Sequence, residues 1–263
     1  MEAVTAVGKG ITLEQMGINL IPQEASNNWI DQKSIIVADP KVGKSTFIAQ
    51  ADKKSYFIRM ATEFNGLKTY GKDCFDLSSV RREIDALHKV KQSGLWGTPE
   101  FPVENVVLDP MYRLMDYIAD EVCEEAGNAP SIYEAGGYGV GQRKYKIKLK
   151  SIMRDFEELP AHKWYVFHSV VKEMKEDNDE KKTYQRRVIE MSLKLDFEIT
   201  KLVNNTLHVI SGYSGTLQGR VMVTQGTKFV EAGSKAPCLK KMTSITWTAD
   251  DKANYDNFRK LFT

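Results

Sequence analysis

The feature that most constrains the fold is a nine-residue segment, Ala38 to Thr46, which reads ADPKVGKST. It fits the phosphate-binding pattern [AG]-x-x-x-x-G-K-[ST], with alanine where glycine is the commoner first residue. The β-branched run at residues 34–38 leads into it and predicts a buried strand, and helix-compatible spacing follows over residues 44–51. A strand, a glycine turn and a helix in this order favour an α/β fold around a parallel sheet.

The chemistry of this segment predicts a nucleotide site. Backbone N–H groups around Gly43 would form a concave nest at a helix N-terminus, where partial positive charge favours phosphate. Lys44 would reach the β- and γ-phosphates of ATP, and the Ser45 hydroxyl would bind Mg²⁺. An ordinary strand–turn–helix with a surface lysine is the alternative. The residues expected to contact the nucleotide are Asp39, Pro40, Lys41, Val42, Gly43, Lys44, Ser45 and Thr46.

Three side chains that follow apolar runs are candidates for action on the phosphate. Asp109 ends the run VVLD, and a carboxylate at the end of a neighbouring strand holds Mg²⁺ in phosphate-loop enzymes. Glu63 follows the next strand-like run and is expected to polarise the attacking water, with Asp73 and Asp76 as alternatives. His168 ends a later run and is expected to sense the γ-phosphate, unless its role is structural.

Strand-like and helix-like segments alternate along the chain. We expect further strands at residues 56–58, 106–109, 164–168, 188–193, 207–210 and 220–224, and helices at 79–91, 114–122, 145–156, 196–204 and 254–262. This order predicts one α/β domain with a mostly parallel central sheet flanked by helices. The domain is expected to span residues 34–250, with an N-terminal arm at 1–33 and a C-terminal helix at 251–263.

Composition excludes several classes of protein. With 42% hydrophobic and 10% aromatic residues, the chain is too apolar for a disordered protein. Its 3 cysteines lie far apart, which argues against a disulfide scaffold or a zinc site and favours a reducing compartment. The apolar runs fall far short of the ~20 residues that span a bilayer. We therefore expect a cytoplasmic protein without a membrane partner.

Two segments carry local concentrations of basic residues, although the net charge is only +2. The glycine-rich stretch at 125–142 leads into the first, and residues 169–187, expected to form a mobile loop or a long hairpin, contain the second. Cations beside tyrosines suit nucleic-acid backbones and stacked bases. A solvated helix face and a salt-bridged hairpin are the alternatives. The DNA-binding candidates are Arg143, Lys144, Lys146, Lys148, Lys181, Lys182, Arg186 and Arg187.

These parts, in this order, resemble the RecA-like ATPase core, most closely the compact phage ATPases of the single-strand annealing and recombination group. The resemblance covers about residues 30–245, and the chain departs from the group's pattern at Ala38 and Lys41. It implies a RecA-like core that binds ATP and Mg²⁺, and two loops that face single-stranded DNA. It also implies a homo-oligomeric ring or filament, a single-strand DNA-binding protein as a further partner, and the host cytoplasm as location.

The resemblance further implies that a neighbouring subunit contributes a cation to the ATP site. Related proteins often carry Lys-x-Arg near the last hairpin, and here Lys235 is followed by Pro237 at the arginine position. Lys235 is therefore the candidate, with Lys240 or Lys241 as alternatives. The residues next to the phosphate loop in the sequence include no obvious second cation for the γ-phosphate. We accordingly expect the chain to self-associate and ATP to tighten the assembly.

The leading hypothesis is an ATPase that acts on single-stranded DNA in recombination or replication, by annealing or strand pairing. A nucleotide-switched loader or assembly factor without pairing activity is the alternative. A third hypothesis is a ring in which bound nucleotide only holds the subunits together. Stimulation of hydrolysis by single-stranded DNA distinguishes the first two.

Overall fold

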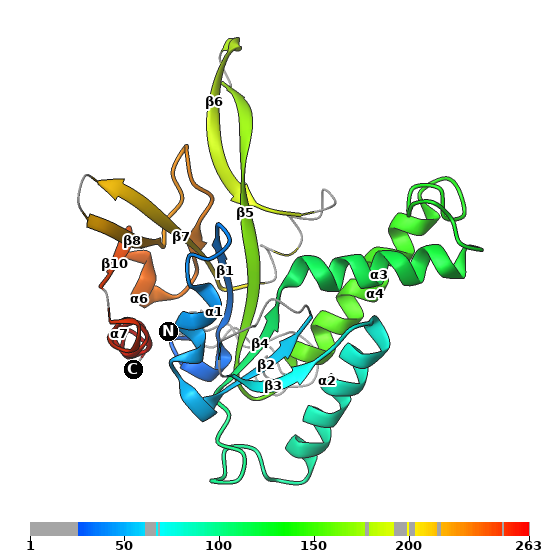
Figure 1. Ribbon diagram of the computed structural model, residues 1–263, viewed down its shortest axis with the longest axis horizontal. Coiled ribbons are helices and arrows are strands. Elements are labelled where there is room, and N and C mark those ends of the chain that lie inside the picture. The colour runs from blue at the N-terminus through cyan, green and yellow to red at the C-terminus, as the bar shows by residue number, and fades with distance from the viewer. Residues whose placement is uncertain are drawn as a thin grey trace, which may run out of the picture.

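A ten-stranded, mostly parallel sheet organises the chain (Figure 1). The computed structural model describes residues 26–60, 67, 69–176, 179–191, 199, 203–214, 217–248 and 250–262. The strand order is β10-β8-β7-β1-β5-β4-β2-β3, while β6 pairs with β5 and β9 with β7. The strands are β1 (Lys33–Ala38), β2 (Ser55–Arg59), β3 (Tyr70–Asp73), β4 (Asn105–Asp109), β5 (His162–Glu176), β6 (Asp179–Ile189), β7 (Asn205–Ser214), β8 (Leu217–Val223), β9 (Gly233–Ser234) and β10 (Ser244–Trp247).

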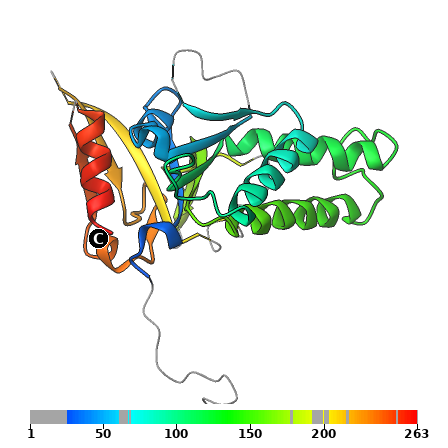
Figure 2. The same ribbon diagram turned by 90° about the horizontal axis from the view of Figure 1, so that it is seen from below.

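Helices cover both faces of the sheet (Figure 2). They are α1 (Lys44–Ala49), α2 (Leu77–Gln92), α3 (Met111–Glu125), α4 (Val140–Glu157), α6 (Pro237–Lys240) and α7 (Asp251–Lys260), with the 3-10 helices η1 (Trp29–Asp31) and η2 (Asp52–Lys54). Successive side chains of a strand point to opposite faces. Ile35 and Val37 of β1 accordingly join the core beneath α2, α3 and α4, whereas Ile36 and Ala38 join the core beneath α1 and α7. The predicted fold class is confirmed.

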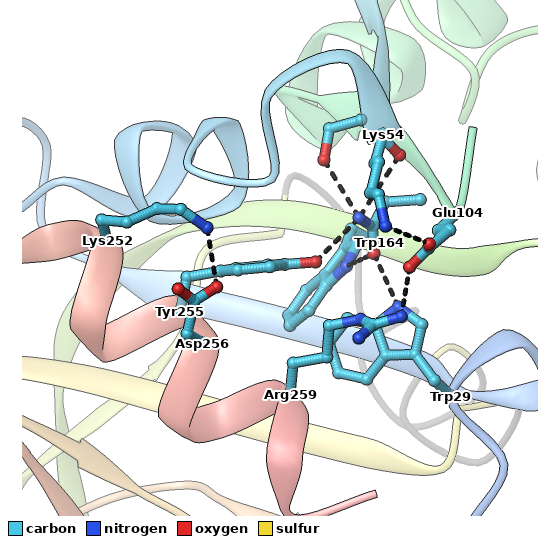
Figure 3. A network of polar contacts seen from close by, with 10 residues as sticks. Trp29, Lys54, Glu104, Trp164, Lys252, Tyr255, Asp256 and Arg259 are labelled. Carbon is cyan, nitrogen blue, oxygen red and sulfur yellow. Dashed lines mark hydrogen bonds and ion pairs between the residues drawn. The ribbon is translucent and has the colours of Figure 1, made fainter. Parts of the chain in front are cut away.

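A buried asparagine, Asn105, joins distant parts of the chain on the α7 face, and its partners Trp29, Trp164 and Tyr255 are labelled in Figure 3. Asn105 Oδ1 accepts hydrogen bonds from the indole Nε1 atoms of Trp29 and Trp164, each at 3.2 Å. Its Nδ2 donates to Ser55 Oγ at 3.1 Å and to the Tyr255 hydroxyl at 2.9 Å. Four elements, η1, β2, β5 and α7, are thereby fixed to β4.

The boundaries of the structure differ from the predicted arm at residues 1–33. Trp29 is only 5% exposed and packs against Phe258 and Phe262. Residues from Trp29 onward therefore belong to the core, which the sequence did not reveal because an isolated tryptophan has no periodicity. Residues 1–25 lie outside the described residues.

Residues 169–187, expected to form a mobile loop or a long hairpin, form the hairpin. The pairing of β5 with β1 ends at His168, and beyond it β5 pairs antiparallel with β6 from Ser169↔Ile189 onward. The β5–β6 hairpin thus projects from the carboxyl edge of the sheet (Figure 1). Of the strand predicted at 188–193, only Val188 and Ile189 are strand, as the end of β6; Glu190 and Met191 follow it outside any strand, and residues 192–193 and most of the helix predicted at 196–204 lie outside the described residues. No helix among the described residues is long and apolar enough to cross a membrane.

Candidate nucleotide-binding site

The phosphate loop lies at the carboxyl edge of the sheet, between β1 and α1. Gly43 is the N-cap of α1 and has φ 102°, a left-handed conformation that favours glycine. A Cβ atom at this position would also lie 2.8 Å from Arg220 Nη1. The backbone conformation therefore favours glycine here, whereas the Arg220 side chain would have to shift to make room for a Cβ atom.

Lys44 is held at the mouth of the loop although it is only 5% exposed. Its Nζ donates hydrogen bonds to the carbonyl oxygens of Ala38, at 2.9 Å, and Asp39, at 3.1 Å. A buried ammonium is stable only when its donors are satisfied, and these carbonyls satisfy it. The position agrees with the predicted role of Lys44 beside the phosphates.

Ser45 and Asp109, the two predicted Mg²⁺ residues, meet in the structure. Ser45 Oγ donates to Asp109 Oδ2 at 2.5 Å, and Asp109, the last residue of β4, is only 4% exposed. Hydroxyl and carboxylate oxygens are the ligands that Mg²⁺ prefers. A buried carboxylate needs a hydrogen-bond donor or a cation beside it. The Ser45 hydroxyl and the Asp109 carboxylate are therefore suitable ligands for the predicted Mg²⁺.

Arg187, predicted to contact DNA, lies against the phosphate loop instead. Its Nη1 is 2.7 Å from both carboxylate oxygens of Asp39, which also accepts a hydrogen bond from Ser169 Oγ. Burial alone would raise the pKa of Asp39, but the Ser169 and Arg187 hydrogen bonds and the Arg187 charge together hold that pKa below its usual value. The residues next to the loop in the sequence include no obvious second cation, but the fold places Arg187 beside it. Arg187 is 148 residues from Asp39 in the sequence, so only the fold reveals it.

A second arginine supports the other side of the loop. Arg220 Nη1 donates to the Val42 carbonyl oxygen at 3.2 Å, and Nη2 to Asp251 Oδ1 at 2.9 Å. Its guanidinium lies 5.1 Å from the ring centroid of Trp247, which stacks on Phe47 of α1 at 4.8 Å. These contacts hold Arg220 as a support behind Gly43, and no local sequence signal indicated it.

His168 occupies the predicted edge of the sheet. It pairs in register with Ala38, immediately before the phosphate loop. Its Nδ1 is 3.7 Å from Glu190 Oε2, and its ring lies 5.2 Å from that of Tyr112. The location is compatible with the predicted contact to a γ-phosphate, and that role remains a prediction.

The predicted water-polarising residue, Glu63, lies outside the described residues. Its alternatives are engaged elsewhere. Asp73 Oδ1 forms an ion pair with Arg59 Nε at 2.5 Å, and Asp76 caps α2 by accepting a hydrogen bond from the Ser79 backbone N–H at 2.6 Å. Both interactions are structural, so neither alternative gains support.

His208 is a buried residue near the loop, and no motif in the sequence indicated it. It pairs in register with Val37 of β1, and its Nδ1 lies 3.2 Å from the Glu231 carbonyl oxygen. Burial lowers its pKa to about 4, despite that backbone contact, and the charge of Arg187 acts in the same direction. The imidazole is therefore neutral at pH 7.

The basic run on α4 is largely compensated by acidic residues of α3. Lys148 Nζ contacts both Glu121 Oε2 and Glu125 Oε1 at 2.6 Å, and Lys144 Nζ lies 3.6 Å from Glu125 Oε2. Arg143 and Lys146 are exposed. These pairs favour the alternative interpretation, a solvated helix face, for this segment.

The β5–β6 hairpin gathers cations and aromatic rings on one face. Directly opposite residues of an antiparallel pair share a face, and the register places Lys172 opposite Arg186, and Met174 opposite Tyr184. Lys228 Nζ lies 4.5 Å from the centroid of the Tyr184 ring and forms an ion pair with Glu176 Oε1 at 2.5 Å, which compensates its charge. We call this surface the hairpin cation–aromatic face; its residues are Lys172, Lys182, Tyr184, Arg186, Lys228 and Phe229.

Two properties of the hairpin cation–aromatic face are unusual for a purely structural surface. Like charges directly opposite one another, as at Lys172 and Arg186, destabilise a strand pair. Phe229 is 57% exposed, with its ring 6.1 Å from and perpendicular to that of Tyr184. The side chain of Lys181, another predicted contact, lies outside what the structure describes.

Lys235, the candidate for action on a neighbouring subunit, lies at the opposite edge of the sheet from the phosphate loop. It follows β9, which pairs with the beginning of β7 at Asn205↔Ser234, and its backbone N–H donates to the Asn204 carbonyl oxygen at 2.7 Å. Lys235 could therefore serve only the site of another copy. That role remains a prediction.

A protein-family model described as an AAA domain matches residues 30–236, which include β1, the phosphate loop, Asp109 and the β5–β6 hairpin. No curated protein matches the chain.

Proposed function

The chain belongs to the AAA domain family of P-loop ATPases, and from this premise we propose that it couples hydrolysis of Mg·ATP to work on single-stranded DNA. Family membership and the phosphate loop support nucleotide hydrolysis. The DNA substrate rests on the hairpin cation–aromatic face. The work we propose is annealing or strand pairing in recombination or replication, as in the phage ATPases that the sequence resembles.

Each residue of the site has a separate role in binding or hydrolysing ATP. Lys44 exchanges the carbonyl oxygens of Ala38 and Asp39 for oxygens of the β- and γ-phosphates. Ser45 and Asp109 would hold Mg²⁺, which would neutralise charge that develops on the phosphate oxygens. Hydrolysis breaks the bond between the γ-phosphorus and the bridging oxygen as the oxygen of water bonds to phosphorus. The proton of that water passes to a base, for which Glu63 is our candidate.

The position of the hairpin carries the proposal for DNA. The β5–β6 hairpin and the phosphate loop leave the same edge of the sheet, since β5 passes His168 and continues into the hairpin. Cations neutralise a phosphate backbone, and exposed aromatic rings stack on bases whatever their sequence. The face combines both properties beside the nucleotide site, which suits a single strand whose binding must be coupled to hydrolysis.

Replacing two hairpin lysines should reduce the salt dependence of DNA binding. Each neutralised phosphate of a single strand contributes about −0.7 to the slope of log affinity against log salt. The double variant Lys172→Ala/Lys182→Ala should therefore flatten the slope by about 1.4 units, if each lysine neutralises one phosphate. Fluorescence anisotropy of a labelled oligothymidylate, titrated at several salt concentrations, measures this.

The matched comparison is Lys144→Ala/Lys148→Ala on α4. It removes the same charge from the segment that the α3 carboxylates compensate. We expect its slope to equal that of the wild type. A flattened slope in the α4 variant, with none in the hairpin variant, would instead locate the DNA contact on α4 and contradict the role of the hairpin.

The proposed function also includes the assembly of several copies of this chain. We extend it to a homo-oligomeric ring or filament on DNA and to a single-strand DNA-binding protein as partner, both of which the resemblance supports. The alternative, a nucleotide-switched loader, requires no stimulation of hydrolysis by DNA. Sedimentation with and without a slowly hydrolysed ATP analogue tests the assembly, and hydrolysis with and without DNA separates the two functions.

A further inference from the structure

Two cations approach the same residue of the phosphate loop from different directions. Lys44 Nζ binds the backbone carbonyl oxygen of Asp39, and Arg187 Nη1 binds its carboxylate. The side chains of the Arg187–Asp39 pair are 31% and 40% exposed, respectively. The ion pair is therefore open to solvent beside the place where Lys44 would meet a polyphosphate.

The Arg187 guanidinium keeps donors available for a second acceptor. Both of its contacts to Asp39 use Nη1, and no described residue accepts a hydrogen bond from its Nε or Nη2. A planar guanidinium binds phosphate oxygens through two parallel hydrogen bonds, and a phosphate carries more charge than one carboxylate. A γ-phosphate near the loop would thus compete well with Asp39.

The backbone of Arg187 is fixed while its side chain lies at the solvent boundary. Its N–H donates to the Phe229 carbonyl oxygen at 2.8 Å, and its carbonyl oxygen accepts from the Glu231 N–H at 3.0 Å. Arg187 also pairs with Val171 across the hairpin. A side-chain movement from Asp39 to a phosphate requires no rearrangement of this backbone.

Arg220 is the other cation beside the loop, but its contacts suit a different role. Its two Nη atoms are already bound to Val42 and Asp251, and its guanidinium lies over Trp247. Transfer to a nucleotide would break all three interactions. Arg187 would exchange only one partner residue.

We propose that Arg187 is this chain's own cation for the γ-phosphate of ATP, and that the γ-phosphate replaces Asp39 as its partner. This inference rests on one part of the proposed function, the hydrolysis of ATP, and does not depend on DNA binding. As the bond to the bridging oxygen breaks, the guanidinium neutralises charge on the γ-phosphoryl oxygens.

Neighbouring residues of a strand face opposite ways. Arg187 therefore faces the phosphate loop, while Arg186 belongs to the hairpin cation–aromatic face, and one strand links the two sites.

The test compares nucleotides that differ by the γ-phosphate, in the absence of DNA. Calorimetry of wild type and Arg187→Ala with ADP and with a slowly hydrolysed ATP analogue gives four affinities. We expect Arg187→Ala to weaken binding of the ATP analogue by about 10-fold or more and that of ADP hardly at all. Its turnover of ATP should fall by about 10³-fold, the lower end of the range for a transition-state arginine. Arg187→Lys should retain part of the affinity for the ATP analogue and part of the turnover, because lysine keeps the positive charge.

Two controls keep the result interpretable. Arg154→Ala removes an arginine whose side chain is 70% exposed and paired only with Asp155 among the described residues, and it should match the wild type. Thermal unfolding of Arg187→Ala verifies that the variant is folded. Equal losses of affinity for ADP and for the ATP analogue would reveal a merely structural role and overturn the proposal.

A mixing experiment tests whether Arg187 acts within its own chain. Lys44→Ala and Arg187→Ala chains, mixed in equal amounts, should hydrolyse ATP no faster than the two variants measured separately. Recovery of turnover in the mixture would assign Arg187 to a neighbouring site and overturn the proposal.

A wild-type chain that binds neither nucleotide would overturn both this inference and the ATPase assignment. Hydrolysis that Arg187→Ala abolishes but DNA does not stimulate would contradict only the DNA part of the proposed function.

Discussion

Asp109→Asn is expected to reduce the rate of ATP hydrolysis by about 10²- to 10³-fold and to raise the Mg²⁺ concentration needed for half-maximal rate. Asparagine keeps the shape of the side chain and an oxygen that can accept the Ser45 hydrogen bond, which is 2.5 Å long in the wild type. It removes the negative charge that would hold a divalent cation. Initial rates across a Mg²⁺ titration measure both effects.

Ser45→Thr is the matched control for this experiment. Threonine retains the hydroxyl, and the phosphate-loop pattern accepts either residue at this position. We expect hydrolysis with a Mg²⁺ dependence close to that of the wild type. If Asp109→Asn shows the same Mg²⁺ dependence as the wild type, Asp109 does not hold the metal, and its contact with Ser45 is purely structural.

Asn105→Ala is expected to lower the free energy of unfolding by about 3–5 kcal/mol. The substitution leaves the indole N–H groups of Trp29 and Trp164 without their acceptor, and the Ser55 and Tyr255 hydroxyls without their donor (Figure 3). Each unsatisfied buried polar group costs about 1–3 kcal/mol, and the costs are not additive. Urea denaturation followed by tryptophan fluorescence measures the change.

A nearby surface contact provides the comparison for Asn105→Ala. Lys54 forms an ion pair with Glu104 at 2.6 Å, and the Lys54 side chain is 51% exposed. Exposed ion pairs contribute about 0–1 kcal/mol, so Lys54→Ala should have a small effect. If Asn105→Ala proved no more destabilising than Lys54→Ala, the asparagine would not be what holds η1 and α7 to the sheet.

The sequence predicted the parts of the site that depend on local order. The phosphate loop is one continuous segment, so its residue types and spacing indicate its conformation directly. Asp109 lies elsewhere, but it ends a buried apolar run, and the carboxyl ends of parallel strands meet at one edge. The 2.5 Å contact between Ser45 and Asp109 agrees with that reasoning.

The arginines beside the loop could not be predicted in the same way. Arg187 and Arg220 lie 148 and 178 residues from their loop partners, and the sequence does not specify which strands pair. The basic character of residues 186–187 was visible, but their assignment to opposite faces depends on the hairpin register. The pairing of Lys148 with Glu121 could not be predicted either, because it depends on how α3 packs against α4.

The hairpin itself gave an ambiguous sequence signal for a physical reason. Strands are recognised by apolar residues alternating with polar ones, which requires one face to be buried. Beyond His168 the hairpin leaves the sheet, and exposed residues such as Val171 and Lys172 occupy both of its faces. Short edge strands such as β3, with the sequence YGKD, lack the pattern too, and β3 was not predicted.

The most direct test of the account is the rate of ATP hydrolysis by the full chain at saturating Mg·ATP, with and without single-stranded DNA. We predict that saturating oligothymidylate raises the rate, and that Lys172→Ala/Lys182→Ala retains the DNA-free rate but needs more DNA to reach the same stimulation. A rate that does not change when DNA binding is saturated would contradict the proposed coupling between the hairpin and the nucleotide site.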